Sequence, residues 1–189
     1  MPLFEQPVEP AVLICAILTP GSPEMAAATE RIERHLGPIT NRSPAYQFDF
    51  SAYYREEMGD GLVKQFFRVG NTVDPASLYD AKRKTMEIER ELAEEKNGRL
   101  CRHANIDPGL VSIESLVLAT TKYSGHRVCI GAGLFAETTL LFQQGKYQPQ
   151  QWTYPDYQTP LVEAFLLEIR DTLLQSRRGS GKNDGSPSL

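Results

Sequence analysis

An uninterrupted apolar run from Ala11 to Leu18 constrains the fold of this chain more than any other stretch. Its residues are all apolar rather than alternating with polar ones, which is typical of a strand buried on both faces in the middle of a sheet. A Pro20-Gly21 pair ends the run, and Pro23 fits the first position of a helix that the Gly37-Pro38 pair would stop. The chain is therefore predicted to begin with a central strand followed by a helix.

The following segments continue this alternation. Aromatic residues alternate with polar ones after residue 45, which indicates a strand with one wet face, and Asp74-Pro75 repeats the signature of a helix start. In chain order we predict a strand at 39–50, a loop at 53–61, a strand at 62–69, a helix from Asp74 to residues 96–98, a strand at 99–106 and a turn at Asp107-Pro108-Gly109. This β-α-β-β-α-β order predicts an α+β protein with a ferredoxin-like core rather than a doubly wound parallel sheet.

The rest of the chain should extend that core. Apolar residues spaced by four, from Leu161 to Leu173, predict a helix near the C-terminus. The other predicted additions are a short helix at 113–119 and strands at 126–130 and 134–143, with an antiparallel hairpin turning at Gln144-Gly145. We divide the chain into an N-terminal extension at 1–10, a single α+β domain at 11–176 and a polar, disordered tail at 177–189.

Composition limits the classes of function. Hydrophobic residues make up 41% of the 189 residues, which is enough for one well-filled core. The net charge of −4 disfavours non-specific binding to nucleic acid, because that binding depends on Lys and Arg neutralising phosphates. A local basic pocket is still compatible with this charge.

Cysteine usage and targeting signals bear on location. Cys15, Cys101 and Cys129 are far apart and have neither CxxC spacing nor a nearby His pair, so we predict reduced thiols and no metal site. The apolar run at 11–18 is too short to span a bilayer, and no Lys or Arg precedes it as a secretory signal would require. We therefore expect a cytoplasmic protein without a membrane partner.

The densest cluster of reactive side chains lies between Thr120 and Arg127. Lys122 supplies a point charge, Arg127 a planar fork of donors and Thr121 a hydroxyl, so this loop could bind a phosphate or carboxylate. An ordinary exposed polar loop is the alternative, and spacing alone favours it.

Glu137 and His126 are the candidates for acid-base chemistry. Glu137 lies in the predicted strand at 134–143 among large apolar side chains, where a carboxylate must be paired or lose its charge. It could be a general base or a metal ligand, or equally the structural counter-ion of Lys122 or Arg127.

The only tryptophan lies with two tyrosines and an acid in the segment Trp152–Tyr157. Trp152 and Tyr154 could stack on a base or a sugar, while Asp156 could take part in binding. Alternatively, these aromatic rings fill the space at the base of the final helix.

Several sequence blocks in a fixed order resemble one known family. The blocks are Ala11–Thr19, Phe48–Phe50, Tyr53-Tyr54, Glu57–Gly59, Asn105–Gly109, Leu116–Lys122, His126-Arg127, Gly131, Ala136-Glu137 and Trp152–Tyr157. Together they are similar to the prokaryotic family known as domain of unknown function 4416, over residues 11–174, although Ser124-Gly125 stand where that family usually has one residue. The resemblance implies a soluble domain of this length and names no reaction. It marks as motif positions Asp107, Lys122, His126, Arg127, Glu137 and Trp152–Tyr157.

Two functional hypotheses follow. In the first, the protein is a small-molecule enzyme or a ligand-binding protein: Lys122 and Arg127 bind an anionic ligand, which could be phosphorylated, and Glu137 or His126 acts as acid or base. The predicted pocket also contains Thr121, Trp152, Tyr154 and Asp156.

In the second hypothesis, a non-enzymatic module binds RNA or protein through the aromatic residues at 46–54 on an open sheet face. The sequence identifies no cofactor and no oligomeric state, and it does not decide between enzyme and binding protein.

Overall fold

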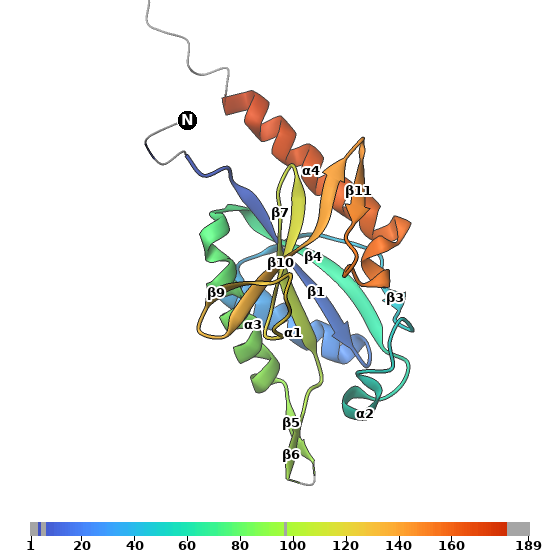
Figure 1. Cartoon of the computed structure of the whole chain (residues 1–189). Coiled ribbons are helices and arrows are strands. Elements are labelled where there is room, and N and C mark those ends of the chain that lie inside the picture. The colour runs from blue at the N-terminus through green and yellow to red at the C-terminus, as the bar shows by residue number, and fades with distance from the viewer. Residues whose placement is uncertain (1–3, 5–6, 97, 181–189) are drawn as a thin grey trace, which may run out of the picture.

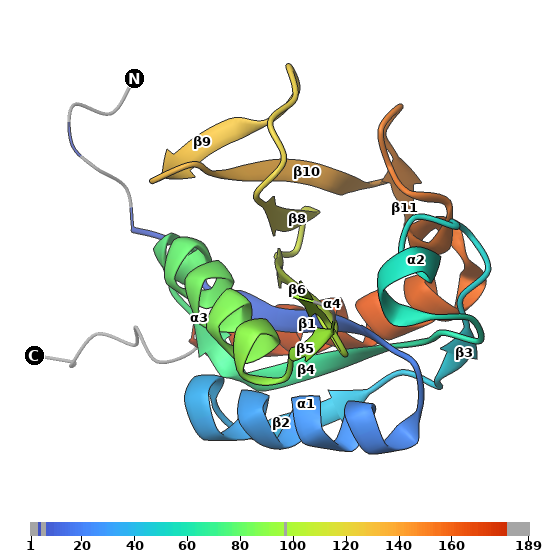
Figure 2. The ribbon, with the colours of Figure 1, turned by 90° about the horizontal axis from the view of Figure 1, so that it is seen from below.

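The computed structural model describes residue 4, residues 7–96 and residues 98–180, and its centre is strand β1 (Ala11–Thr19) (Figure 1). All nine residues of β1 are buried, as the apolar run predicts. The side chains of Ala11, Leu13, Cys15 and Ile17 pack with helices α1 (Ser22–Leu36) and α3 (Leu78–Glu91). These two helices contact each other (Figure 2). The side chains of Val12, Ile14 and Ala16 pack with helix α4 (Pro160–Ser180) on the other face. The fold therefore has helices on both faces of its central strand.

The main sheet is antiparallel at every strand pair in the described part of the chain. Its order is β11-β10-β8-β7-β1-β4-β2, with β3 paired to β4 and β9 paired to β10. The strands that join β1 are β2 (Ile39–Arg42), β3 (Tyr46–Gln47), β4 (Val63–Val73), β7 (Asn105–Val111), β8 (Ser115–Thr120), β9 (Val128–Gly131), β10 (Leu134–Gln143) and β11 (Lys146–Pro149). The shorter elements are α2 (Arg55–Met58), the 3-10 turns η1 (Pro75–Ser77) and η2 (Pro155–Gln158), and a hairpin of β5 (Glu94–Lys96) and β6 (Arg99–Cys101).

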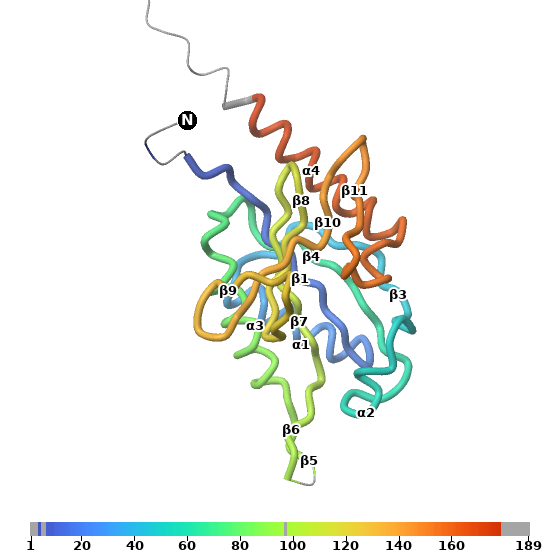
Figure 3. The backbone as a smooth tube through the Cα atoms, viewed as in Figure 1, coloured from blue at the N-terminus to red at the C-terminus, as the bar shows by residue number. Residues whose placement is uncertain are grey.

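The predicted mixture of helices with a mostly antiparallel sheet is confirmed, and several element boundaries are corrected. The strand predicted at 39–50 is broken into β2 and β3 by the Ser43-Pro44-Ala45 segment, because proline lacks the N–H that a ladder needs. The loop at 53–61 contains α2, and α3 ends at Glu91 rather than at residues 96–98. The residues beyond α3 form the β5–β6 hairpin, which projects from the body of the molecule (Figure 3).

The turn predicted at Asp107-Pro108-Gly109 is wrong, because β7 runs straight through it. Strand β7 pairs with β1 along its whole length, but it pairs with β8 only from Gly109 onward. Pro108 is tolerated because its missing N–H has no β8 partner to reach. Gly109 is required for close packing instead of turning, since a Cβ there would lie 2.6 Å from Leu118 Cδ2.

The short helix predicted at 113–119 is also wrong, because this segment forms strand β8. Leu116 and Leu118 pack in the cluster that contains α4, whereas Val117 and Ala119 pack in the cluster that contains α3. An apolar run with both faces buried has no alternation, so periodicity could not separate a strand from a helix here.

The C-terminal predictions hold better. Strand β10 has the predicted bounds, and the hairpin turns at Gln144 and Gly145 with φ of 53° and 82°, the left-handed conformation that a tight hairpin needs. Helix α4 extends to Ser180, so residues 177–180 are helical instead of belonging to a tail. Residues 181–189 lie outside the described residues. None of the helices in the described part is long and apolar enough to cross a membrane.

Candidate functional site

A cavity of about 510 Å³ lies at one end of the main sheet, where β7 and β8 separate. The residues of β7 before Gly109 pair only with β1, and the residues of β8 after Leu118 pair only with β10. Asn105 and Asp107 line one side of the resulting gap, and Ala119 and Thr120 line the other. The Asp-Pro-Gly sequence therefore marks the point where the sheet divides.

The cavity is lined by charged and aromatic side chains from many parts of the chain. Strand direction explains part of this, because the end of β1 and the start of β4 meet at the same edge of an antiparallel sheet. The basic lining residues are Lys64, Lys82, Arg102, Lys122 and Arg127. The acidic ones are Glu89, Asp107, Glu137 and Asp156, and the aromatic ones are Phe48, Tyr53, Tyr54, Tyr154 and Tyr157.

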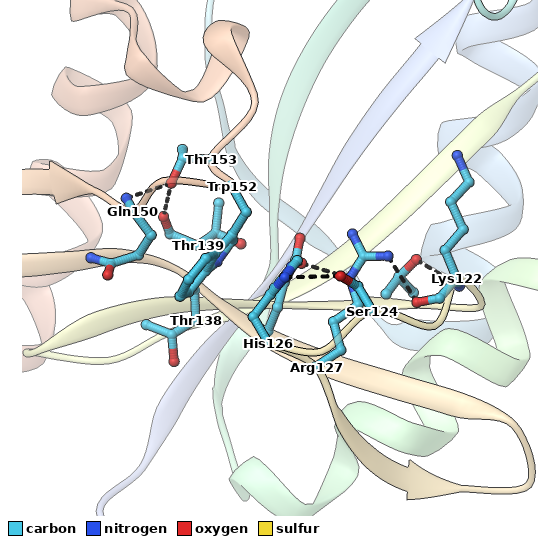
Figure 4. A network of polar contacts seen from close by, with 11 residues as sticks. Lys122, Ser124, His126, Arg127, Thr138, Thr139, Gln150, Trp152 and Thr153 are labelled. Carbon is cyan, nitrogen blue, oxygen red and sulfur yellow. Dashed lines mark hydrogen bonds and ion pairs between the residues drawn. The ribbon is translucent and has the colours of Figure 1, made fainter.

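The structure brings most of the predicted site residues together. Six of them line this cavity: Thr121, Lys122, Arg127, Glu137, Tyr154 and Asp156. His126 and Trp152 are not among its lining residues. Their rings stack on each other with centroids 4.4 Å apart and planes at 11°, and the indole Nε1 donates to the Thr138 carbonyl at 2.9 Å (Figure 4). These two residues are linked to the cavity through Glu137, a lining residue that His126 contacts.

Glu137 has the surroundings of a counter-ion. Its side chain is 2% exposed, and its Oε2 accepts from Arg127 Nε at 2.7 Å and from His126 Nε2 at 2.8 Å. A carboxylate only accepts, so Nε2 carries the proton, and Nδ1 lies 3.0 Å from the hydroxyl of Ser124 (Figure 4). Of the two counter-ion partners considered from sequence, the structure selects Arg127. A proton-transfer role for Glu137 or His126 stays a prediction.

Asp156 forms a buried ion pair that the sequence did not predict. Its Oδ2 lies 2.5 Å from Lys64 Nζ, and the two side chains are 4% and 7% exposed. The ammonium also lies over the rings of Phe48, Phe66 and Tyr157, at 4.6–5.5 Å from their centroids. Lys64 was missed because a single lysine in an apolar strand is usually assigned to the wet face.

The α3 wall contributes two further charged residues that sequence reasoning missed. Lys82 Nζ donates to the Ile106 carbonyl at 3.2 Å and lies 3.5 Å from Asp107 Oδ1, while Glu89 Oε1 accepts from Ile106 N at 2.6 Å. Lys82 and Glu89 are seven residues apart, two helical turns, and each is adjacent to a residue of the apolar stripe. Charged residues next to the apolar stripe of a helix are the signal that could have identified Lys82 and Glu89.

Arg102 fixes the loop that covers one side of the cavity. Its Nε and Nη2 donate to the two carboxylate oxygens of Glu57 in α2 at 2.9 and 2.7 Å, and its Nη1 donates to Asn105 Oδ1 at 3.0 Å. These bonds lower the pKa of the Glu57 carboxyl. The contact joins α2, and with it Tyr53 and Tyr54, to the start of β7.

The aromatic residues at 46–54 do not lie on an open sheet face. Strand β3 has only two residues, and Phe48 and Tyr54 pack against the buried cluster of Leu18, Met58 and Leu62. Part of this group lines the cavity instead. Tyr53 is 62% exposed, and the ammonium of Lys122 lies 4.1 Å from its ring centroid.

Glu89 has an unusual acidity among the lining residues. Burial raises the pKa of its carboxyl to about 7, although the charge of Lys82 and the hydrogen bond from Ile106 N oppose this effect. Asp107 adds to the increase, and Arg102 opposes it. Glu89 therefore changes its charge near neutral pH, inside the cavity.

We expect Glu89 to make the protein less stable as the pH rises from about 4.5 to about 7. The folded protein keeps a proton in this window that the unfolded chain has lost, so the free energy of unfolding falls by up to about 1.4 kcal/mol per pH unit. The contribution is complete below the ordinary pKa of 4.5 and is lost as the pH passes about 7. Urea denaturation of the wild type and Glu89→Gln across this range measures it. Parallel pH profiles for the two proteins would contradict the assignment.

Comparison with known proteins identifies the family. No curated protein and no solved structure matches this chain. The model of one family matches residues 9–173, which cover the whole fold from the start of β1 into α4 and include every lining residue of the cavity. The chain therefore belongs to the family described as Domain of unknown function (DUF4416).

Proposed function

We propose that the cavity binds a small anionic molecule that carries a phosphate group. The observation that carries this proposal is the state of Lys122. In the described part of the chain its ammonium forms no ion pair, and its contact is with the face of the Tyr53 ring. An ammonium at the cavity wall without a carboxylate partner is available to an anionic ligand.

The charges around Lys122 support the same conclusion. The five basic lining residues exceed the four acidic ones, although the whole chain is acidic. Arg127, whose side chain is 8% exposed, has its Nε on Glu137 and its Nη1 on the Lys122 carbonyl at 2.8 Å, so its planar fork has a fixed orientation beside Lys122. A guanidinium with a fixed orientation beside an ammonium that has no ion pair suits the binding of a phosphate group.

The rest of the lining suits an organic ligand rather than a bare ion. A volume of about 510 Å³ is in the range of small-molecule sites, and aromatic rings line the cavity together with Leu18 and Met86. Within this proposal Glu137 positions Arg127, and His126 supports Glu137. The sequence-based assignment of Glu137 or His126 as acid or base would apply if the bound molecule also reacts.

Thermal denaturation in the presence of inorganic phosphate and pyrophosphate, at constant ionic strength, tests this function. We expect each compound to raise the Tm of the wild type with increasing concentration, because a ligand that binds only the folded state stabilises it. Lys122→Ala should weaken binding about tenfold or more, the loss of one charged hydrogen bond. Lys146→Ala, which removes an exposed lysine on β11 outside the cavity, should leave binding unchanged. A Tm that no phosphate compound raises would refute the proposal.

We also propose that β1, α1, β2, β4, α3 and β7 form a ferredoxin-like core. The support is the strand order β7-β1-β4-β2, in which β2 and β7 each follow a helix that passes over one strand. On this view β8, β10 and β11 extend the core beyond β7. A solved structure of the chain that differed in this strand order would reject the assignment.

A further inference from the structure

We propose that the ligand of this cavity carries a hydrogen-bond-donating amine in addition to its anionic group, with Lys122 binding the anion and Glu89 binding the amine. The inference rests on the proposed function and specifies the chemical class of the ligand, an amino phosphate. It follows from the pairing of the charges that line the cavity.

Four of the five basic lining residues already have a carboxylate partner. Lys64 pairs with Asp156, Lys82 with Asp107 and Arg127 with Glu137, while Arg102 pairs with Glu57 outside the lining. These pairs also use three of the four acidic lining residues. One basic and one acidic side chain remain without an ion pair among the described residues, and they are Lys122 and Glu89.

Glu89 is buried, and its hydrogen bonding is incomplete. The residue is 8% exposed, and its Oε1 accepts from Ile106 N. Oε2 has no donor among the described residues, because Lys82 bonds to Ile106 and Asp107, and Arg102 bonds to Glu57 and Asn105. The Glu89 side chain lines the cavity, so a donor on a ligand can hydrogen-bond to this free carboxylate oxygen.

Tyr157 is a second buried polar residue of the lining. Its hydroxyl is buried without a hydrogen-bond partner among the described residues, and the residue is 3% exposed and lines the same cavity. Unsatisfied buried hydroxyls are uncommon in folded proteins, because losing the bonds to water costs free energy. The hydroxyl oxygen has almost no exposed surface, so a ligand in the cavity does not reach it, and the inference rests on Lys122 and Glu89.

The acidity of Glu89 gives the proposal a distinct signature. A protonated amine beside the carboxyl favours its charged form and lowers its pKa, which burial had raised to about 7. The other charged groups that act on Glu89 are Lys82, Arg102 and Asp107, and Tyr54 lies close enough to interact with it. Binding of an amino phosphate near pH 7 should therefore release a proton from Glu89.

Calorimetry with matched probes tests the inference. The probes are alkyl phosphates and ω-aminoalkyl phosphates of graded chain length, titrated in buffers of different ionisation enthalpy, so that proton release is measured with affinity. In the wild type we expect an aminoalkyl phosphate to bind about tenfold or more tightly than its alkyl counterpart, with proton release. Glu89→Gln should lose both effects but still bind the alkyl phosphate. Its amide oxygen can accept the same bond from Ile106 N, so the fold should tolerate it.

The outcomes separate the two proposals. Equal affinity for the two series, or an amine advantage that persists in Glu89→Gln, would overturn the inference while leaving phosphate binding intact. If neither series nor inorganic phosphate binds, the proposed function fails and this inference fails with it. A second arm uses the wild type alone: the affinity ratio of the two series should rise as the pH increases through 7, and a constant ratio would overturn the inference. The ammonium lowers the second pKa of the phosphate in the amino series, so that pKa is measured for each compound and the affinities are compared for the dianions.

Discussion

Replacing Asp156 with alanine should destabilise the protein by about 3–5 kcal/mol, because it leaves the ammonium of Lys64 buried without its partner. The Lys64 side chain is 7% exposed and its ammonium lies among aromatic rings, so water in the cavity solvates it less well than the carboxylate did. The free energy of unfolding from urea denaturation measures the loss. A change below about 1 kcal/mol would show that the pair is not buried as described.

Two further variants isolate the effect of burial. The double replacement Lys64→Met with Asp156→Leu removes both charges and should recover most of the stability, since apolar residues of similar volume often replace buried pairs without loss. Lys84 and Glu87 on α3 are also 2.5 Å apart, but their side chains are 37% and 41% exposed. Glu87→Ala should leave the free energy of unfolding nearly unchanged, because solvent screens an exposed pair.

Glu137→Ala should cost about 3 kcal/mol, the second largest loss that we expect. It leaves the guanidinium of Arg127, 8% exposed, without a counter-ion, and it removes the acceptor of His126 Nε2. Equilibrium unfolding in urea measures the change. Adding Arg127→Met should restore part of the stability, because the unpaired charge is then removed.

The exposed pair of Arg55 and Asp60 serves as the control for Glu137. Its nitrogen and oxygen lie 2.6 Å apart, close to the 2.7 Å of Arg127 and Glu137, but the side chains are 68% and 79% exposed. Asp60→Ala should therefore have little effect. If Glu137→Ala were as mild as Asp60→Ala, the counter-ion role would be rejected.

The fold could be predicted where burial of apolar side chains determines the local sequence pattern. The run at 11–18 is apolar on both faces because β1 has helices on both sides, and α4 has one apolar stripe because it covers one face. The prediction failed where the partner of a segment decides its conformation. Residues 107–109 have the composition of a turn, and residues 113–119 have the composition of either element, but pairing with β1 and β10 makes both into strands.

The part of the site that comes from one continuous stretch of sequence could be predicted, and the part that comes from distant elements could not. Lys122, Arg127 and Glu137 come from one continuous stretch that carries many reactive groups, so the sequence draws attention to them. Lys64, Lys82 and Glu89 are isolated in otherwise apolar or amphipathic elements. The tertiary fold brings these three to one cavity, and no local sequence pattern links strand β4 with helix α3.

The pair of Lys64 and Asp156 joins residues that are 92 positions apart, and this separation affects when the cavity can exist. During synthesis Lys64 leaves the ribosome long before η2 and α4 are made. A shortened chain without these elements would expose Phe66 and the α4 face of β1, and it would lack one wall of the cavity. Bringing Lys64 and Asp156 together is slow, because the chain between them loses conformational entropy before the ion pair forms. A ligand of this cavity would therefore bind only the completed chain, and it would select fully folded molecules over partly folded ones.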